Sequence, residues 1–278
     1  MPLKIIAILL LLPCLVSAQG GIAADKGRLY FTGAEGDVLF EDLTLNNPTE
    51  TPLHLQVFYG DWKRDSTGVK QYSLPGTLAH SCSEWLSVSP QVITVPATEK
   101  VTVRVRMEVP ADYAAEEGVK NSMIYFRQMK AAKRSHVSAD GVRSEINVLF
   151  QLGVHAYFSP ASLQQKAIAL QSMTTDSLTR VTVGLENTGQ TLLTASIRLE
   201  LTDLATGNEI NVLPKPLLVP FMPQDFRYVR LDLPADLPPG RYSALVITDI
   251  GPEHDLELGI LEFGEMRRPA KRVAAQSN

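Results

Sequence analysis

The sequence predicts an all-β fold built from two tandem immunoglobulin-like β-sandwich domains. The segment Val101–Met107 alternates strictly between apolar and polar residues, which is typical of a strand with one buried face. Similar short segments recur along the chain between turns rich in Gly, Pro and Asn, and no long segment has a helical period. A length of 278 residues favours two domains.

Residues 1–18 are predicted to be a cleaved secretory signal peptide. Lys4 supplies a positive start, and the apolar run Ile5–Leu12 is too short to span a bilayer as a retained anchor. The small-residue site Val16-Ser17-Ala18 predicts cleavage before Gln19. The sequence therefore predicts an exported protein.

Strands of the first sandwich follow in order along the chain. They are expected at residues 29–31, 38–45, 53–59, 101–107, 123–128 and 146–158. The turn signals Gly33–Gly36 and Asn46-Asn47-Pro48 separate the first three strands. The segment 112–119 is ambiguous and allows a single helical turn. Pro160 ends the last strand, so the first domain is predicted over residues 19–159.

The second sandwich is predicted over residues 160–265. Its strands are expected at residues 180–185, 197–201, 226–233, 242–247 and 256–263. Residues 266–278 form a basic tail, for which we expect a solvated, disordered end; the alternative is a membrane or partner contact.

The segment Ile146–Phe158 is long for a strand. One reading is a core strand with one wet face. The other is that its early part extends beyond the core as an edge strand, able to pair with a partner's sheet. The loop before it, residues 131–145, carries Lys133, Arg134 and Arg143. It is either a docking loop or a solvated connection.

Catalytic and metal-binding patterns do not emerge from the sequence. None of the five histidines lies at metal-ligand spacing, and there is no nucleophile elbow or phosphate loop. Cys82 is the one cysteine beyond the signal segment and reads as a small buried hydrophobe; nearby His80 is weak evidence for a catalytic pair. A net charge of −4 argues against nucleic acid as a partner. We predict no catalytic residue, metal or cofactor, and no small-molecule substrate.

Two patches resemble a known family. The opening segment Asp25–Gly33 followed by Thr44–Asn47, and the closing Ala156-Tyr157-Phe158-Ser159-Pro160, are similar to the PapD-like periplasmic chaperones of pilus assembly. That resemblance implies a chaperone that inserts its long strand into an incomplete subunit sandwich. It also implies that an Arg on the first strand and a Lys on the long strand hold the subunit's terminal carboxylate.

The resemblance assigns the first cation to a residue of this chain but finds no match for the second. Arg28 matches the first cation, although a solvated strand-end charge is the alternative. The long strand has no Lys or Arg and offers Gln151 and His155 as possible cleft contacts. Subunit contacts on this strand are expected from its apolar residues Ile146, Val148, Phe150 and Leu152.

The predicted function is therefore that of a periplasmic chaperone for an exported, β-rich, pilin-like subunit, with an outer-membrane assembly platform as a further partner. The alternative is a structural or adhesive cell-envelope protein made of two sandwich modules. The patch Glu84–Pro90, with Trp85 as a core anchor, also resembles the immunoglobulin-like modules of bacterial surface proteins. A processing enzyme with scattered catalytic residues is the third possibility.

Overall fold

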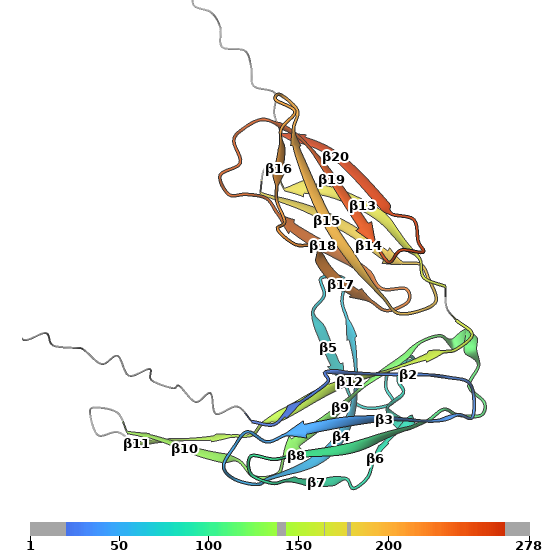
Figure 1. The fold of residues 1–278 in the computed structure, drawn as a ribbon, viewed down its shortest axis with the longest axis vertical. Helices are drawn as coiled ribbons and strands as arrows, with labels where there is room; N and C mark the ends of the chain where they lie inside the picture. Colours follow the sequence, from blue (N-terminus) through green and yellow to red (C-terminus); the bar gives the residue numbers. More distant parts are fainter. Residues whose placement is uncertain (1–20, 138–142, 164, 177–178, 265–278) are drawn as a thin grey trace, which may run out of the picture.

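The computed structural model describes residues 21–137, 143–163, 165–176 and 179–264 (Figure 1). They form two β-sandwiches, as the sequence predicts. The only helical elements among these residues are two single turns, η1 (Ser83–Trp85) and η2 (Ala115–Glu117). The predicted signal peptide 1–18 and basic tail 266–278 lie outside the described residues. None of the helices in the described ranges is long and apolar enough to cross a membrane.

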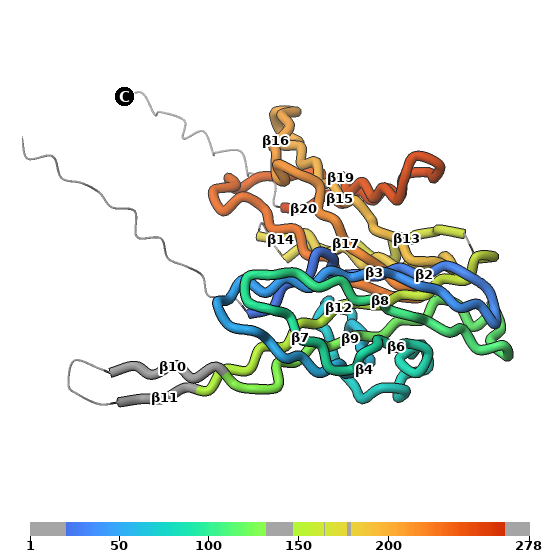
Figure 2. The backbone as a smooth tube through the Cα atoms, turned by 60° about the horizontal axis from the view of Figure 1, so that its bottom comes forward, coloured from blue at the N-terminus to red at the C-terminus, as the bar shows by residue number. Residues whose placement is uncertain are grey.

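The first sandwich consists of two sheets (Figure 2). One has the order β1 (Ala23–Ala24), β3 (Val38–Asn46), β8 (Lys100–Glu108), β6 (Leu86–Val88). The other has the order β2 (Arg28–Gly33), β12 (Gln151–Pro160), β9 (Lys120–Gln128), β4 (Leu53–Arg64), β5 (Lys70–Ser73), and β7 (Val92–Val95) also pairs with β4. The N-terminal segment thus contributes β1 to one sheet and β2 to the other. There β2 runs parallel to β12.

The core of the first sandwich follows the predicted alternation. In β8, Val103, Val105 and Met107 are buried, whereas the residues between them face outward. Trp85 is partly buried at one end of this core. There its ring packs edge-on against Phe158, with the ring centres 5.5 Å apart.

The second sandwich also has two sheets. One has the order β13 (Ile168–Asp176), β14 (Arg180–Asn187), β18 (Phe226–Asp232). The other has the order β16 (Glu209–Asn211), β15 (Leu193–Asp203), β19 (Arg241–Asp249), β20 (Glu257–Gly264), and β17 (Leu217–Phe221) also pairs with β15. Its core is separate from the first and includes Val183, Leu185 and Tyr242.

The predicted single strand 146–158 is wrong in detail. The chain forms β11 (Arg143–Val148), breaks at Leu149-Phe150, and resumes as β12. The predicted loop 131–145 contributes β10 (Ala132–Val137), which pairs with β11 in a separate two-stranded ribbon (Figure 1). This ribbon belongs to neither sandwich sheet, so the alternation expected of a sandwich strand does not apply to it, and β10 was not predicted.

Candidate functional site in the cleft between the sandwiches

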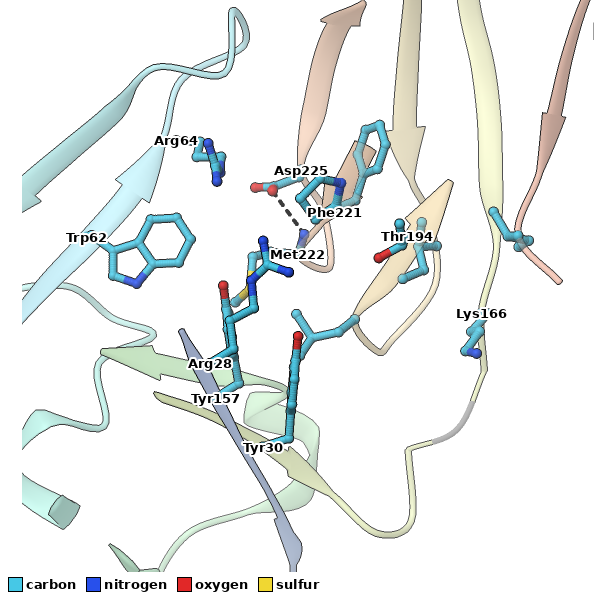
Figure 3. Close-up of a pocket in the computed structure, with 14 residues that line it drawn as sticks. Arg28, Tyr30, Trp62, Arg64, Tyr157, Lys166, Thr194, Phe221, Met222 and Asp225 are labelled. Atoms are coloured by element: carbon cyan, nitrogen blue, oxygen red, sulfur yellow. Dashed lines mark hydrogen bonds between the residues drawn. The ribbon is translucent and has the colours of Figure 1, made fainter. Parts of the chain in front are cut away.

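A hollow of about 360 Å³ lies between the two sandwiches and is called the cleft below. From the first sandwich it is lined by Arg28, Tyr30, Trp62, Arg64 and Tyr157, and from the second by residues that include Thr194, Phe221, Met222 and Asp225 (Figure 3). The two arginines therefore face a largely apolar wall that carries one acid, Asp225, and one lysine, Lys166.

The parallel pairing of β2 with β12 places Arg28 in the cleft. Arg28 is opposite His155 in this pairing, and Tyr30 is opposite Tyr157. The two tyrosine rings stack with their centres 5.4 Å apart. In the described part of the chain, the Arg28 guanidinium has no hydrogen bond or ion pair, so its charge is available to a ligand.

The β4–β5 hairpin carries Arg64 and one further cation, Lys70, which lies beside the cleft. Arg64 and Lys70 are paired at the end of this hairpin, and both lie over the Trp62 ring, 5.4 and 5.5 Å from its centre. The Lys70 ammonium donates to Nε2 of His155 at 2.8 Å, which leaves the proton of the neutral imidazole on Nδ1. Trp62 is buried and packs with Met222 across the cleft.

The pKa shifts show a positive potential that is not neutralised. Burial, and after it the charges of Lys70, Arg28 and Arg64, together lower the pKa of His155 to about 4. Burial and the two guanidinium groups also lower the pKa of Lys70. These cations destabilise one another, so an anion entering here gains favourable electrostatic energy.

Asp225 is the acid on the opposite wall. Its Oδ2 accepts a hydrogen bond from the Met222 amide at 2.9 Å (Figure 3). Burial raises its pKa, although Arg227 and Arg64 oppose that shift. Among the described residues it has no ion pair within 4 Å. Asp225 therefore leaves the cations of the first sandwich without a direct partner.

The other predicted contacts lie along β11 and β12. Neither Gln151 nor His155 lines the cleft; both line a neighbouring hollow with Lys70. Oε1 of Gln151 accepts from Arg127 Nε at 2.7 Å. Leu152 is half-buried against the first core, and Val148 ends β11. Phe150 lies at the break and is half-buried against Gly21, where a Cβ would collide with its ring. Ile146 lies within β11.

One side of this segment is an open backbone edge. β12 pairs with β9 over residues 151–158, but β2 covers its other side only from His155 onward. β11 pairs with β10 alone. Within the described ranges, no strand pairs with the remaining side of residues 143–154, called the open edge below. Leu149, 56% exposed, lies in it. Such an edge is a template for a further strand.

Sequence reasoning missed Trp62, Arg64, Lys70 and Tyr157. The turn sequence Asp65-Ser-Thr-Gly68 between two cationic arms is the signal that could have found the hairpin. Lys120, another lysine close to the long strand, is buried and donates to Glu117 and to the Ala79 carbonyl. It is therefore committed elsewhere.

Two kinds of reactive group were considered in the sequence, a metal site and the cysteine thiol. The ranges that the structure describes contain no cluster of three His, Cys, Asp or Glu side chains able to hold a metal ion. Cys82 is buried, as predicted for a small hydrophobe, and burial raises the pKa of its thiol to about 12. It is therefore protonated near neutral pH and is a poor nucleophile.

Comparison with known proteins gave matches to solved structures alone, because no family model and no curated protein matches the sequence. A chaperone–tip-subunit complex, CsuC–CsuE of Acinetobacter baumannii Csu pili, is matched at 12% identity and a TM-score of 0.45. That match covers 89% of this chain and 100% of the other. The E. coli chaperone DraB is matched at 14% identity, 89% and 97% coverage and a TM-score of 0.43. The Pseudomonas aeruginosa chaperone CupB2 is matched at 15% identity, 87% and 99% coverage and a TM-score of 0.41. The solved structures to which this chain is similar thus include pilus chaperones, at low identity and low TM-score.

Proposed function

We propose that this protein is a periplasmic assembly chaperone for an exported β-rich subunit. The subunit adds a strand along the open edge, and its terminal carboxylate enters the cleft. One observation carries the proposal: β12 starts in the open edge and leads to the cluster of Arg28, Arg64 and Lys70 around His155. A single strand thus connects a template for backbone pairing with a site for an anion.

The open edge and the cleft would each bind a different part of the subunit. Strand addition supplies backbone hydrogen bonds, and exposed apolar side chains such as Leu149 supply contact area. A carboxylate in the cleft accepts charge-assisted hydrogen bonds from the unpaired Arg28 guanidinium. Because His155 is neutral at physiological pH, it holds Lys70 in place without adding to the repulsion.

A defined peptide tests the proposal. A twelve-residue peptide of alternating apolar and polar residues is prepared with a free C-terminal carboxylate and, as its match, with a C-terminal amide. We expect the purified protein to bind the carboxylate form more tightly. Arg28→Ala should weaken its binding by about 2–5 kcal/mol and abolish the difference between the two forms. Equal affinity of the native protein for both forms would contradict the proposal.

Cell fractionation distinguishes a chaperone from a structural protein of the cell envelope. A chaperone is recovered as a soluble complex with one small β-rich chain. A structural or adhesive envelope protein of two sandwich modules instead stays with the membrane or with a surface assembly. Recovery of the protein only in that fraction would favour the alternative and leave Arg28 as a surface charge.

A further inference from the structure

The β4–β5 hairpin reaches from the first sandwich to the second (Figure 1). Its turn, residues 65–69, is called the tip below. The Tyr228 amide donates to the Ser66 carbonyl at 2.8 Å. Tyr228 belongs to β18, which in the described part of its sheet pairs only with β14. The tip therefore caps the free side of an edge strand of the other sandwich.

The tip has a defined internal structure. Oδ1 of Asp65 accepts from the amides of Thr67 and Val69, at 2.9 and 3.1 Å. Gly68 has φ +92°, a conformation that L residues rarely adopt, and its carbonyl accepts from Arg64 Nη1 at 2.9 Å. The tip and the Arg64 guanidinium are thus one hydrogen-bonded unit.

Arg227 of the second sandwich fits against this unit. A Cβ on Gly68 would lie 2.9 Å from Nη1 of Arg227, so the guanidinium occupies the space that the missing side chain leaves. Arg227 is only 5% exposed, and its Nη2 donates to the Pro220 carbonyl at 3.2 Å. The tip is therefore packed against a buried side chain as well as hydrogen-bonded to a strand edge.

Docking matters because the hairpin carries the cations. Arg64 and Lys70 flank the tip, and only four residue pairs, from Asp61–Ser73 to Arg64–Lys70, join the two arms. So short a two-stranded ribbon is marginally stable without further support. Arg28, Arg64 and Lys70 also repel one another, which favours moving the hairpin away from the cleft.

We propose that docking of the tip on Tyr228 and Arg227 is what holds Arg64 in the cleft and Lys70 beside it, against His155. The second sandwich then determines the charge of the site that the first sandwich presents, and Tyr228 and Arg227 are positioning residues. The use of this charge to bind a carboxylate rests on the proposed function, whereas the positioning itself is measured without any ligand.

The test removes a single hydrogen bond. Tyr228→Pro deletes the amide that donates to Ser66, and proline is tolerated on the free side of an edge strand. Tyr228→Ala controls for loss of the ring. Arg230→Pro controls for proline on the same side of β18, where Arg230 has no backbone bond to the first sandwich within the described residues.

The readout is the titration of His155 followed by NMR. With Lys70 and Arg64 in place the imidazole titrates near pH 4. We expect Tyr228→Pro to raise its proton affinity at least tenfold, because the imidazole becomes more exposed as the hairpin and its cations move away. Both control variants should stay at the native value. Amide exchange of Thr67 and Val69 should quicken in the same variant alone. A native titration curve in Tyr228→Pro, with or without faster exchange, overturns the inference.

Peptide binding then distinguishes the two proposals. If the native protein prefers the carboxylate peptide, Tyr228→Pro should reduce that preference at least fivefold while the control variants retain it. A native protein with no preference refutes the proposed function, and the His155 titration still decides the positioning. Full preference in a Tyr228→Pro protein whose His155 titration has shifted overturns the link between the tip and the anion site.

Discussion

Each sandwich has a buried asparagine that closes a turn after a strand, but the two asparagines make different numbers of hydrogen bonds. Asn47 and Asn187 are both fully buried at the end of a strand. Nδ2 of Asn47 donates to three carbonyls, and its Oδ1 accepts from both the amide and the hydroxyl of Thr49. Nδ2 of Asn187 donates to Thr191, and its Oδ1 accepts from Gly189. The shared asparagine serves the sandwich architecture and not the site.

The two sandwiches differ in the charge that each presents to the cleft and in what lies next to each exposed sheet edge. The first presents Arg28 and Arg64 in the cleft, with Lys70 beside it, whereas the second presents mostly apolar residues with Asp225 and Lys166. Both have an exposed apolar residue at an edge, Leu149 at the break between β11 and β12 and Ile260 on β20. Only in the first is that edge continuous with cations. Exposed apolar edges alone therefore do not identify a binding surface.

The largest effect on the free energy of unfolding is expected when the two buried asparagines are replaced. Asn47→Ala leaves three carbonyls and two donors without their partner, so we expect a loss of about 3–4 kcal/mol in the free energy of unfolding. Asn187→Ala should cost about 2 kcal/mol. Urea unfolding measures both. Equal losses would mean that the extra bonds of Asn47 contribute nothing.

A pH effect is expected from His155 of the first sandwich. His155 titrates near 4 when folded and near 6.5 when unfolded, so the unfolded chain binds the proton more tightly. Stability should therefore fall as the pH drops from about 6.5 to 4, by about 3 kcal/mol at most. His155→Gln should flatten that part of the stability curve. An unchanged slope in the variant would show that other groups cause the pH dependence.

A smaller effect is expected from the two exposed edges. Leu149→Asp should weaken binding of the carboxylate peptide about tenfold, or about 1.4 kcal/mol, while leaving the unfolding free energy within about 0.5 kcal/mol. The matched variant Ile260→Asp, at a residue 71% exposed on β20, should leave binding unchanged. Equal weakening by both variants would remove the distinction between the two edges.

Much of the fold could be predicted because strand alternation follows from the backbone. Side chains two residues apart share a face, so Val101–Met107 indicates a strand without knowledge of its neighbours. Strands lacking that alternation were missed, as in the β10–β11 ribbon, and so was β5, which carries Lys70. Arg28 was predicted by resemblance, and the structure brings it into the cleft.

The sequence by itself determined the all-β class, the turn asparagines and the place of Arg28 at the start of a strand, because each depends on residues close together in the chain. Only the tertiary structure decided which cations meet. Lys70 and His155 are 85 residues apart and come together through the pairing order of β12, β9, β4 and β5. The docking of the tip on Tyr228 depends on how two sandwiches pack. Neither pattern nor spacing encodes such a contact, because it joins segments that share no local period.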